Sequence, residues 1–461
     1  MLVKETRVHF VGIGGVGMSA LAQVLLEAGH QVSGSDLNRS DFTARLRRAG
    51  IRIAIGHRAE NVGAAELVVV SSAVPQSNPE VQYALSKGVR IIKRADLLGE
   101  LTRKFRSIAV AGTHGKTTTS SMIGFILERA GLDPTLLIGG TIANLGTNAK
   151  MGRGQYLVAE ADEFDGSFLK LSPWMAVVTN VEADHLDFYH SMEAIETAFG
   201  QFIASVPEDG CVILCADDLR LMRIAGAPRA RVISYALGTR ADWQAQDIVA
   251  NADGGNDFTA VADGREVGRF SLRVPGRHNV QNALAAIAAT TDIGVKPGVI
   301  AMALAEFGGA RRRFELKGRV GGIAVYDDYA HHPTEIKATL RAARERYRGR
   351  LWCVFQPHTY HRTKQLWNDF LTAFGDADQV ILCDIYLPAG READTLGITS
   401  RDLARAMSHP GAQYIGDLKS AASYLCSTLQ DGDVLVTMGA GNVYEVAESV
   451  VACLRKRLGG S

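Results

Sequence analysis

Residues 7–20 read RVHFVGIGGVGMSA, an apolar run followed by a glycine-rich turn. Gly12, Gly14 and Gly17 fall at the spacing G-x-G-x-x-G, and Asp36 ends the next apolar stretch. Such glycines permit a tight turn and a close approach of backbone to a diphosphate, and the acidic residue usually contacts a ribose. The stretch therefore predicts a Rossmann-like domain that binds a nucleotide diphosphate. Taken alone, it favours NAD.

Apolar strands and amphipathic helices alternate along the whole chain of 461 residues. This alternation predicts an α/β fold with parallel sheets covered on both faces. We expect an N-terminal Rossmann-like domain over 1–106, a central P-loop ATPase-type domain over 107–318 and a C-terminal Rossmann-like domain over 319–461. Within the central domain, residues 231–275 have short alternating strands with Asn, Asp and Gly turns, which suggests a small antiparallel patch.

Composition excludes several function classes. The formal net charge is +1, so no global field attracts nucleic acid or an anionic membrane. The N-terminal segment is too short and too charged for a signal peptide, and no run of 18 apolar residues exists, which predicts a cytoplasmic protein without a membrane span. The six cysteines form no C-x-x-C pair and are expected to be reduced, mostly buried thiols.

A second glycine-rich loop, GTHGKTTT, follows an apolar strand at residues 112–119 and leads into a helix. Strand, loop and helix in this order are the context of a P-loop, although Val110 stands where the strict pattern has glycine. The loop amides and the helix N-terminus would face ATP phosphates. Lys116 would reach the β- and γ-phosphates, and the Thr117 hydroxyl would bind Mg²⁺. The alternative is a glycine-rich turn with a surface lysine.

Acidic residues stand at the ends of two further strands of the central region. Glu160, Asp162 and Glu163 follow one strand, and Asp184 and His185 follow the next. Ligands gather at the carboxyl ends of strands in an open parallel sheet, so these side chains are expected to meet the P-loop. Taken singly, Glu160 could be a solvated turn acid and His185 a core or surface histidine. Together they predict a metal–nucleotide site that holds a hard cation.

Six stretches occur in an order and spacing that resemble the Mur ligases, the ATP-dependent amino-acid ligases of peptidoglycan synthesis. They are AGTHGKTTT, AEADEFDGSFL, VTNVEADHLDFY, GRHNVQNALAA, DDYAHHPTEI and FQPHTYHRT. The resemblance spans nearly the whole chain. It implies that ATP phosphorylates the lactyl carboxylate of UDP-N-acetylmuramate and that L-alanine then attacks the acyl phosphate. It also implies a monomer or homodimer that binds neither nucleic acid nor membrane.

The resemblance assigns roles to individual residues. The implied ATP-binding set is Gly112, Thr113, His114, Gly115, Lys116, Thr117, Thr118, His278, Asn279 and Asn282. The implied magnesium ligands are Thr117, Glu160 and His185. The implied UDP-substrate set is Gly12, Gly14, Gly15, Gly17, Asp36, Ser71, Glu163 and Arg313. Tyr329, His331 and Arg362 would bind the amino acid, and the catalytic set would be Lys116, His185, Asp328, His331 and Arg362.

Four positions depart from the family pattern. Thr359 stands where many relatives have arginine, so one contact to the amino-acid carboxylate would come from elsewhere. Phe164 and Gly166 replace smaller or polar residues beside the expected muramyl site, and Asn442 replaces an aspartate. Amino-acid selectivity is the property that the departure at Thr359 affects most, whereas Asn442 lies near the expected nucleotide site or hinge.

Three other functions compete with this interpretation. A related ligase attaches a tripeptide to the same UDP-sugar, but its first loop is less regular than GIGGVGMS. A nicotinamide-dependent dehydrogenase would explain the first loop and Asp36 but not the P-loop. A nucleotide switch or transport ATPase would leave the DDYAHH and HTYHRT clusters unexplained. With ATP at the P-loop, the first loop is expected to hold the UDP part of UDP-N-acetylmuramate, and Asp36 becomes a uridine-side contact.

Overall fold

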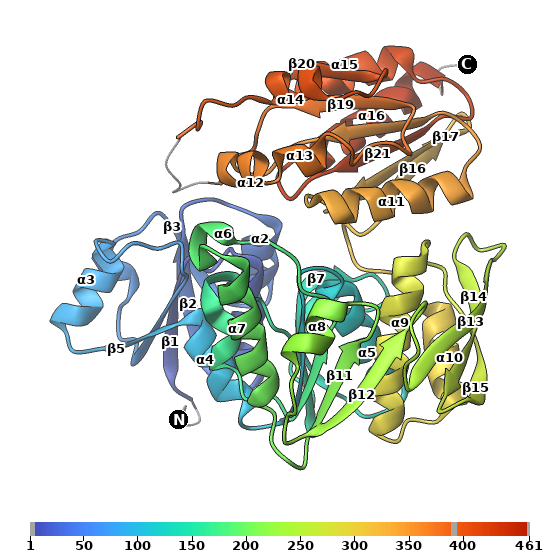
Figure 1. Cartoon of the computed structure of the whole chain (residues 1–461). Coiled ribbons are helices and arrows are strands. Elements are labelled where there is room, and N and C mark those ends of the chain that lie inside the picture. Colours follow the sequence, from blue (N-terminus) through green and yellow to red (C-terminus); the bar gives the residue numbers. More distant parts are fainter. Residues whose placement is uncertain (1–4, 389–393, 459–461) are drawn as a thin grey trace. The chain divides into compact units, whose positions relative to one another are not determined.

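The computed structural model describes residues 5–388 and 394–458 (Figure 1). Two compact units make up the chain. The first comprises Met1–Gln246, Thr259–Phe270 and Gln281–Phe307, and the second comprises Asp247–Phe258, Ser271–Val280 and Gly308–Ser461.

The first unit begins with a five-stranded parallel sheet in the order β3-β2-β1-β4-β5. Its strands are β1 (Arg7–Val11), β2 (Gln31–Asp36), β3 (Arg52–Ile55), β4 (Leu67–Val70) and β5 (Arg90–Lys93). The order changes direction between β1 and β4, and open parallel sheets typically bind ligands at such a switch point, beyond the carboxyl ends of the strands.

Helices follow these strands with clear start signals. They are α1 (Val16–Glu27), α2 (Asp41–Arg48), η1 (Ala59–Asn61), α3 (Pro79–Ser86) and α4 (Arg94–Thr102). Ser40 caps α2 through a reciprocal pair of hydrogen bonds with Thr43. Asn78 caps α3, whose first residue is Pro79. The loop before α1 has no such side-chain cap.

A ten-stranded sheet follows, in the order β15-β14-β13-β12-β11-β10-β6-β9-β7-β8. Its strands are β6 (Arg106–Ala111), β7 (Thr135–Ile142), β8 (Thr147–Lys150), β9 (Tyr156–Glu160), β10 (Met175–Val178), β11 (Cys211–Cys215), β12 (Arg231–Ala236), β13 (Trp243–Ala250), β14 (Asn256–Ala262) and β15 (Arg265–Ser271). The central helices are α5 (Lys116–Arg129), η2 (Phe164–Lys170), α6 (Leu186–Tyr189), α7 (Met192–Ala204), α8 (Leu219–Ile224), α9 (Arg277–Asp292) and α10 (Pro297–Glu306).

The second unit holds a six-stranded sheet in the order β16-β17-β21-β18-β19-β20. Its strands are β16 (Glu315–Val320), β17 (Ile323–Asp328), β18 (Leu351–Phe355), β19 (Gln379–Cys383), β20 (Ala412–Gly416) and β21 (Val434–Met438). Its helices are α11 (Pro333–Arg346), α12 (Tyr360–Gln365), α13 (Trp367–Phe370), α14 (Ser400–Ala406), α15 (Leu418–Thr428) and α16 (Tyr444–Leu458).

Alternate residues of each C-terminal strand enter two separate cores. Cys353 and Phe355 of β18 pack with α11, α13 and α14, whereas Trp352 and Val354 pack with α15 and α16. This two-sided burial explains why the strands read as continuous apolar runs. The expected α/β class with mainly parallel sheets is confirmed.

Two expectations from the sequence are wrong. The antiparallel patch expected over residues 231–275 is wrong for its first part, because β12 pairs in parallel with β11 and β13 pairs in parallel with β12. The polar turns there interrupt a continuing sheet. Not all cysteines are free thiols, because Cys426 and Cys453 form a disulfide. Helices α15 and α16 pack together and bring the two Cα atoms to 6.2 Å, a contact that sequence spacing does not reveal.

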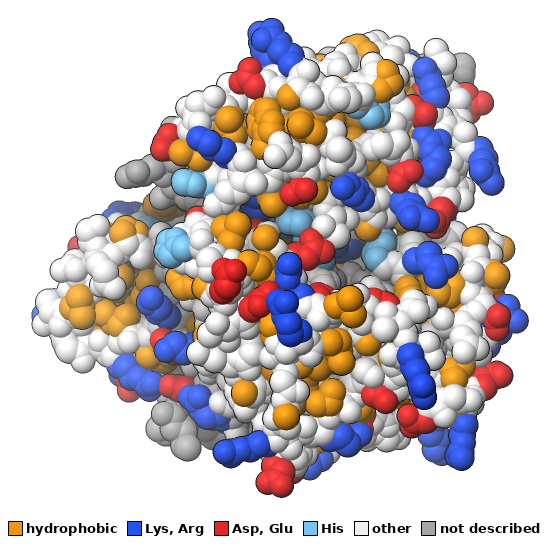
Figure 2. Space-filling view, viewed as in Figure 1, with side chains coloured by type: hydrophobic (Ala, Val, Ile, Leu, Met, Phe, Trp, Pro, Cys, Tyr) orange, Lys and Arg blue, Asp and Glu red, His pale blue; other side chains and the backbone are white. Residues whose placement is uncertain are grey.

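Figure 2 shows basic and acidic side chains interspersed over the visible face, in keeping with the net charge of +1. Among the described helices, none has the length and apolar character needed to cross a bilayer.

Candidate active site

The loop between β6 and α5 is shaped by two glycines with positive φ. Gly112 has φ +129° and Gly115 has φ +82°, values that residues with a side chain rarely adopt. Asn180, just after β10, holds the loop in place: its carbonyl accepts the Thr113 amide at 3.1 Å and its side chain accepts the His114 amide at 2.8 Å. These two hydrogen bonds fix the backbone of the loop. No pattern in the sequence marks Asn180.

Lys116, the first residue of α5, is held inside this loop. Its Nζ donates to Glu163 at 2.7 Å and to the carbonyl of Thr113 at 3.2 Å. Burial by itself would lower the pKa of Lys116, but the nearby carboxylates, led by Glu163, outweigh burial and raise it. Burial raises the pKa of Glu163 to about 7, against the attraction of Lys116. Glu163, expected beside the UDP-substrate, thus contacts the P-loop lysine.

Two of the three implied magnesium ligands lie together. The Thr117 hydroxyl donates to Glu160 at 2.9 Å, and the Gly139 amide donates to the same carboxylate oxygen at 2.9 Å. A hydroxyl beside a carboxylate is the kind of oxygen pair that Mg²⁺ prefers, so these two residues fit the ion. His185 has φ +53° and its ring lies 3.7 Å from Asp184 and edge-on to Phe164. An imidazole nitrogen is a poorer ligand for Mg²⁺ than an oxygen.

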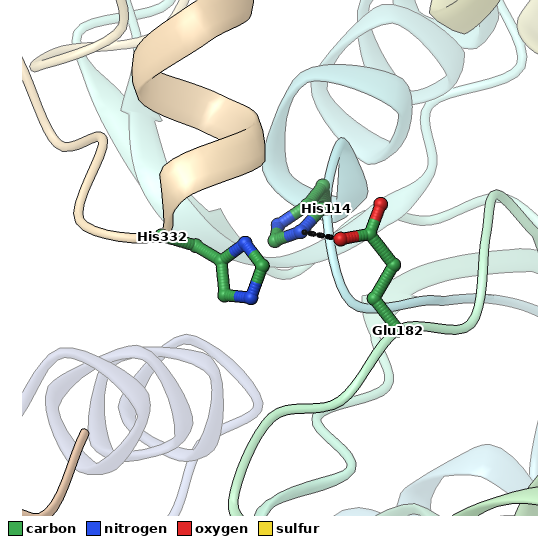
Figure 3. Close-up of side chains that lie close together, drawn as sticks. All are labelled: His114, Glu182 and His332. Carbon is green, nitrogen blue, oxygen red and sulfur yellow. Dashed lines mark ion pairs between the residues drawn. The ribbon is translucent and has the colours of Figure 1, made fainter. Parts of the chain in front are cut away.

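The loop after β10 also contacts the P-loop through side chains. In Figure 3, His114 points toward Glu182, with 3.5 Å between Nε2 and the carboxylate. The Glu182 amide donates to the Thr113 hydroxyl at 2.8 Å. Asn282 of α9 lies directly against Gly115, where it would meet any side chain at that position. The structure therefore brings the expected P-loop residues and Asn282 together within the first unit.

The other two implied ATP contacts, His278 and Asn279, belong to the second unit. Burial lowers the pKa of His278 to about 4, and the charge of Arg313 acts in the same direction. His278 is therefore neutral at physiological pH. The Asn279 side chain donates to the carbonyl of Pro275 at 2.7 Å, which closes the turn before α9.

The first glycine loop has the shape that its sequence predicts. Gly12 has φ +83° and its amide donates to the carbonyl of Ser35 at 2.9 Å. The Gly14 amide donates to Asp36 at 2.7 Å, so the acidic side chain holds the backbone of the loop in place. Ser71, at the end of β4, lies 3.1 Å from the position of a Cβ on Gly12. The implied UDP-substrate residues of this domain thus lie around one turn.

A third cluster lies at the carboxyl end of β17. Asp328 accepts the amides of Phe314 and Ala330, both at 2.7 Å. Burial raises the pKa of Asp328 to about 7, although the charge of Arg313 opposes this rise. Arg313 lies over the ring of Tyr329 at 5.4 Å.

The other residues implied to bind the amino-acid substrate lie next to this cluster. The His331 ring nitrogen Nδ1 lies 3.0 Å from the carbonyl of Tyr329, and the ring lies 6.0 Å from that of His358. His358 Nδ1 lies 3.1 Å from Nη1 of Arg362. The implied amino-acid set of Tyr329, His331 and Arg362 therefore forms one connected group in the second unit.

Thr359 has a local structural role. It is buried, has φ +61° and accepts the Arg362 amide at 3.4 Å as the N-cap of α12. A threonine cap cannot supply the guanidinium that the family pattern predicts at this position. Asn442 accepts a hydrogen bond from Gln356 at 3.1 Å.

The sequence interpretation assigned a site role to Arg313 and none to Arg312. Its guanidinium donates to Asp327 at 2.9 Å and to the carbonyls of Gly441 and Gly439 at 2.9 and 2.7 Å. The run RRRFE gives no signal that separates these arginines. Both guanidinium groups lie over the ring of Tyr329, at 5.0 Å for Arg312 and 5.4 Å for Arg313, but Arg312 also binds the carbonyls of the GAGN loop.

The P-loop and the carboxylates around it define a nucleotide-binding α/β protein with a second glycine-rich loop. The chain belongs to the Mur ligase family. The family model for the Mur ligase middle domain matches residues 110–290. The Mur ligase family catalytic domain matches 7–106, and the glutamate ligase domain matches 312–441.

Full-length relatives are closely similar. The UDP-N-acetylmuramate–L-alanine ligase of Geobacter sp. (strain M21) is 49% identical over 459 residues, covering 99% of both chains. The crystal structure of the UDP-N-acetylmuramate–alanine ligase of Thermotoga maritima matches with a TM-score of 0.82 and 28% identity, covering 99% of this chain and 100% of that one. A murein peptide ligase of Psychrobacter arcticus matches with a TM-score of 0.75 and 30% identity, covering 97% of this chain and 98% of that one.

Proposed function

We propose that this chain ligates L-alanine to the lactyl carboxylate of UDP-N-acetylmuramate at the expense of ATP, in peptidoglycan precursor synthesis. The observation that carries the proposal is the full-length identity of 49% to a ligase of that name. The P-loop with Lys116 supports it, because a P-loop and its lysine serve phosphoryl transfer and have no part in hydride transfer. A nicotinamide-dependent dehydrogenase is therefore no longer a competing function.

The chemistry requires activation of a carboxylate. A carboxylate resists nucleophilic attack because of its negative charge, whereas an acyl phosphate has a good leaving group. Transfer of the γ-phosphoryl group to the lactyl oxygen makes that mixed anhydride, and ADP leaves. The uncharged amine of alanine then attacks the carbonyl carbon, and phosphate departs as the amide bond forms. The protein contributes positioning and charge stabilisation.

Lys116 would neutralise the transferred phosphoryl group. In the structure Glu163 and the carbonyl of Thr113 hold its ammonium, so phosphate oxygens would replace these partners on binding. Thr117 and Glu160 would hold Mg²⁺, which would spread the negative charge of the phosphates. Because the pKa of Glu163 is about 7, this carboxyl can gain a proton when Lys116 turns to the phosphates.

Arg362 would bind the alanine carboxylate, because a guanidinium forms paired hydrogen bonds with a carboxylate. Tyr329 and His331 would line the same pocket, and the hydrogen bond that the Tyr329 carbonyl accepts from His331 Nδ1 fixes the orientation of the imidazole. The first glycine loop would hold the UDP diphosphate, with Asp36 and Ser71 beside it. We assign this reaction to the cytoplasm and to three domains with boundaries near residues 106 and 318.

A substrate-omission assay tests the proposal. Phosphate release from ATP is expected to need both UDP-N-acetylmuramate and L-alanine. ATP turnover that continues unchanged when either is left out would refute the ligase function.

The similarity to a murein peptide ligase keeps a second candidate open, in which a peptide replaces alanine. A panel of L-alanine, glycine, L-serine and the tripeptide separates the two. We expect L-alanine to give the highest kcat/KM.

A further inference from the structure

Arg94 has no role in the reaction proposed above, although it lies beside the first glycine loop. It is the first residue of α4 and follows β5 directly, so it stands at the carboxyl edge of the N-terminal sheet. A Cβ placed on Gly17 would lie 3.0 Å from Nη1 of Arg94, 3.3 Å from its Cδ and 3.6 Å from its Cζ. The guanidinium therefore lies across the first turn of α1, over the third glycine of the loop.

In the part of the chain that the structure describes, no side chain forms an ion pair or a hydrogen bond with the guanidinium of Arg94, which is only partly exposed. By contrast, Arg90 at the start of β5 forms an ion pair with Glu100 at 2.5 Å. An arginine stays charged at every physiological pH, so a half-buried guanidinium without an acceptor carries a desolvation cost.

The surroundings of Arg94 are also short of negative charge. Helix α1 has no side-chain cap and no acidic residue in its first turn, where its dipole is positive. Asp36 is occupied by the amides of Gly14 and Asn38 at 2.7 and 3.1 Å. Asp96 accepts the Lys93 amide at 3.2 Å in the capping box of α4. A positive helix end and an unpaired guanidinium therefore face the same turn.

We propose that Arg94 is a ligand of the UDP-substrate diphosphate, which it grips from α4 while the first turn of α1 supplies backbone amides. The inference rests on the proposed function, which places the UDP-sugar at this loop. It gives Gly17 a role that differs from the usual one. The third glycine of the fingerprint ordinarily permits close packing of helix and strand, whereas here it leaves room for the guanidinium.

Calorimetric titration with UDP and with UDP-N-acetylmuramate, without ATP, tests the inference. Arg94→Ala is expected to raise the Kd of both ligands about 10- to 100-fold. This loss of affinity is typical when a charged hydrogen-bond partner is removed. Arg94→Lys keeps the charge but not the planar fork, so its loss should be intermediate. Uridine lacks phosphate and should bind equally to all three proteins. Arg103→Ala, at the exposed C-terminal end of the same helix, is the matched control.

Kinetics give a second readout that a loss of stability alone would not produce. Arg94→Ala should raise the KM for UDP-N-acetylmuramate while the KM for ATP stays unchanged. Gly17→Ala should also weaken UDP binding by displacing the guanidinium, and this effect should vanish in the Arg94→Ala background. If Arg94→Ala folds poorly, the UDP titration of Arg94→Lys tests the inference instead. The aliphatic stem of the lysine would still cover Gly17 and so preserve the packing.

The outcomes separate this inference from the function on which it rests. Wild-type affinity of Arg94→Ala for UDP, together with a loss in Gly14→Val, would overturn the role of Arg94 and keep the UDP site. Wild-type affinity in both variants would show that the diphosphate binds elsewhere, and the placement of the UDP-sugar would then be wrong.

Discussion

Lys116 and Glu163 show how one buried pair can serve two states of the enzyme. Their side chains are 14% and 4% exposed, so neither charge is well solvated without the other. Burial outweighs the attraction of the lysine and raises the pKa of Glu163 to about 7. The Glu163 carboxyl can therefore take up a proton near neutral pH when phosphate oxygens replace it beside Lys116.

Lys116→Ala is therefore expected to abolish ligation but to keep the fold. We expect at least about a 10²-fold loss of kcat, as for other removed transition-state donors. Stability should change little, because Glu163 can take up a proton once its partner is gone. Phosphate-release kinetics measure the loss of ligation, and circular dichroism checks that the fold is kept. Near-normal turnover in the folded variant would contradict the P-loop assignment.

Arg362 is the residue that we propose to bind the carboxylate of the amino-acid substrate. Arg362→Ala should raise the KM for L-alanine about 10- to 100-fold and leave the KM for ATP unchanged, because only the carboxylate contact is lost. Lys364→Ala is the matched control, since Lys364 lies on the same helix and donates to the carbonyl of Leu396. An unaltered KM for alanine in Arg362→Ala would move the carboxylate site elsewhere.

Among the elements, β7 has a role that its sequence did not suggest. This strand was not expected at all, yet its Gly139 amide holds the Glu160 carboxylate against Thr117. A Cβ at Gly139 would overlap both oxygens of that carboxylate. The strand therefore sets the position of the proposed magnesium ligands.

Gly139→Ala should lower kcat about 10²-fold, the effect that a displacement of about 1 Å can have at a reacting centre. The Mg²⁺ concentration needed for half-maximal activity should rise, and a metal titration followed by intrinsic fluorescence should shift likewise. Gly298→Ala on α10 is the control, because its added methyl would meet open space. Unchanged metal dependence in Gly139→Ala would count against the role of β7.

At the scale of the whole molecule, buried carboxyl groups give stability two opposite slopes with pH. Burial disfavours the charge of Glu80, but hydrogen bonds from His9, Ser35 and Asn61 outweigh it and lower the pKa to about 2. Glu80 therefore stabilises the fold above its ordinary pKa of 4.5, and this contribution is lost as the pH falls toward 2. Asp328 acts in the other direction, because its pKa is raised from 3.8 to about 7.

Since folded Asp328 binds a proton that the unfolded chain has released, stability should fall as the pH rises between about 4 and 7. Asp328→Asn should flatten this part of the profile, although one accepted backbone hydrogen bond is lost. Thermal melts of both proteins between pH 4 and 8 measure the difference in slope. Parallel profiles would show that Asp328 does not keep its proton in the folded state.

Much of the molecule follows from local sequence signals. The glycine spacings at 12–17 and 112–115 predict both loops, because only glycine readily adopts the positive φ found at Gly12, Gly112 and Gly115. Apolar runs flanked by turn residues predict most strands, because burial on both faces leaves little room for polar side chains. The family resemblance adds the ligase chemistry and names the side chains that carry it.

Only the tertiary structure decided which side chains meet across long stretches of chain. Glu163 joins Lys116 over 47 residues, Gly139 joins Glu160 over 21, and the Cys426–Cys453 disulfide joins helices 27 residues apart. Arg94 reaches Gly17 in the same way. Local pattern determines the conformation of each segment, because backbone preferences act over a few residues. Partners distant in sequence are chosen by the packing of whole elements, which no local pattern encodes.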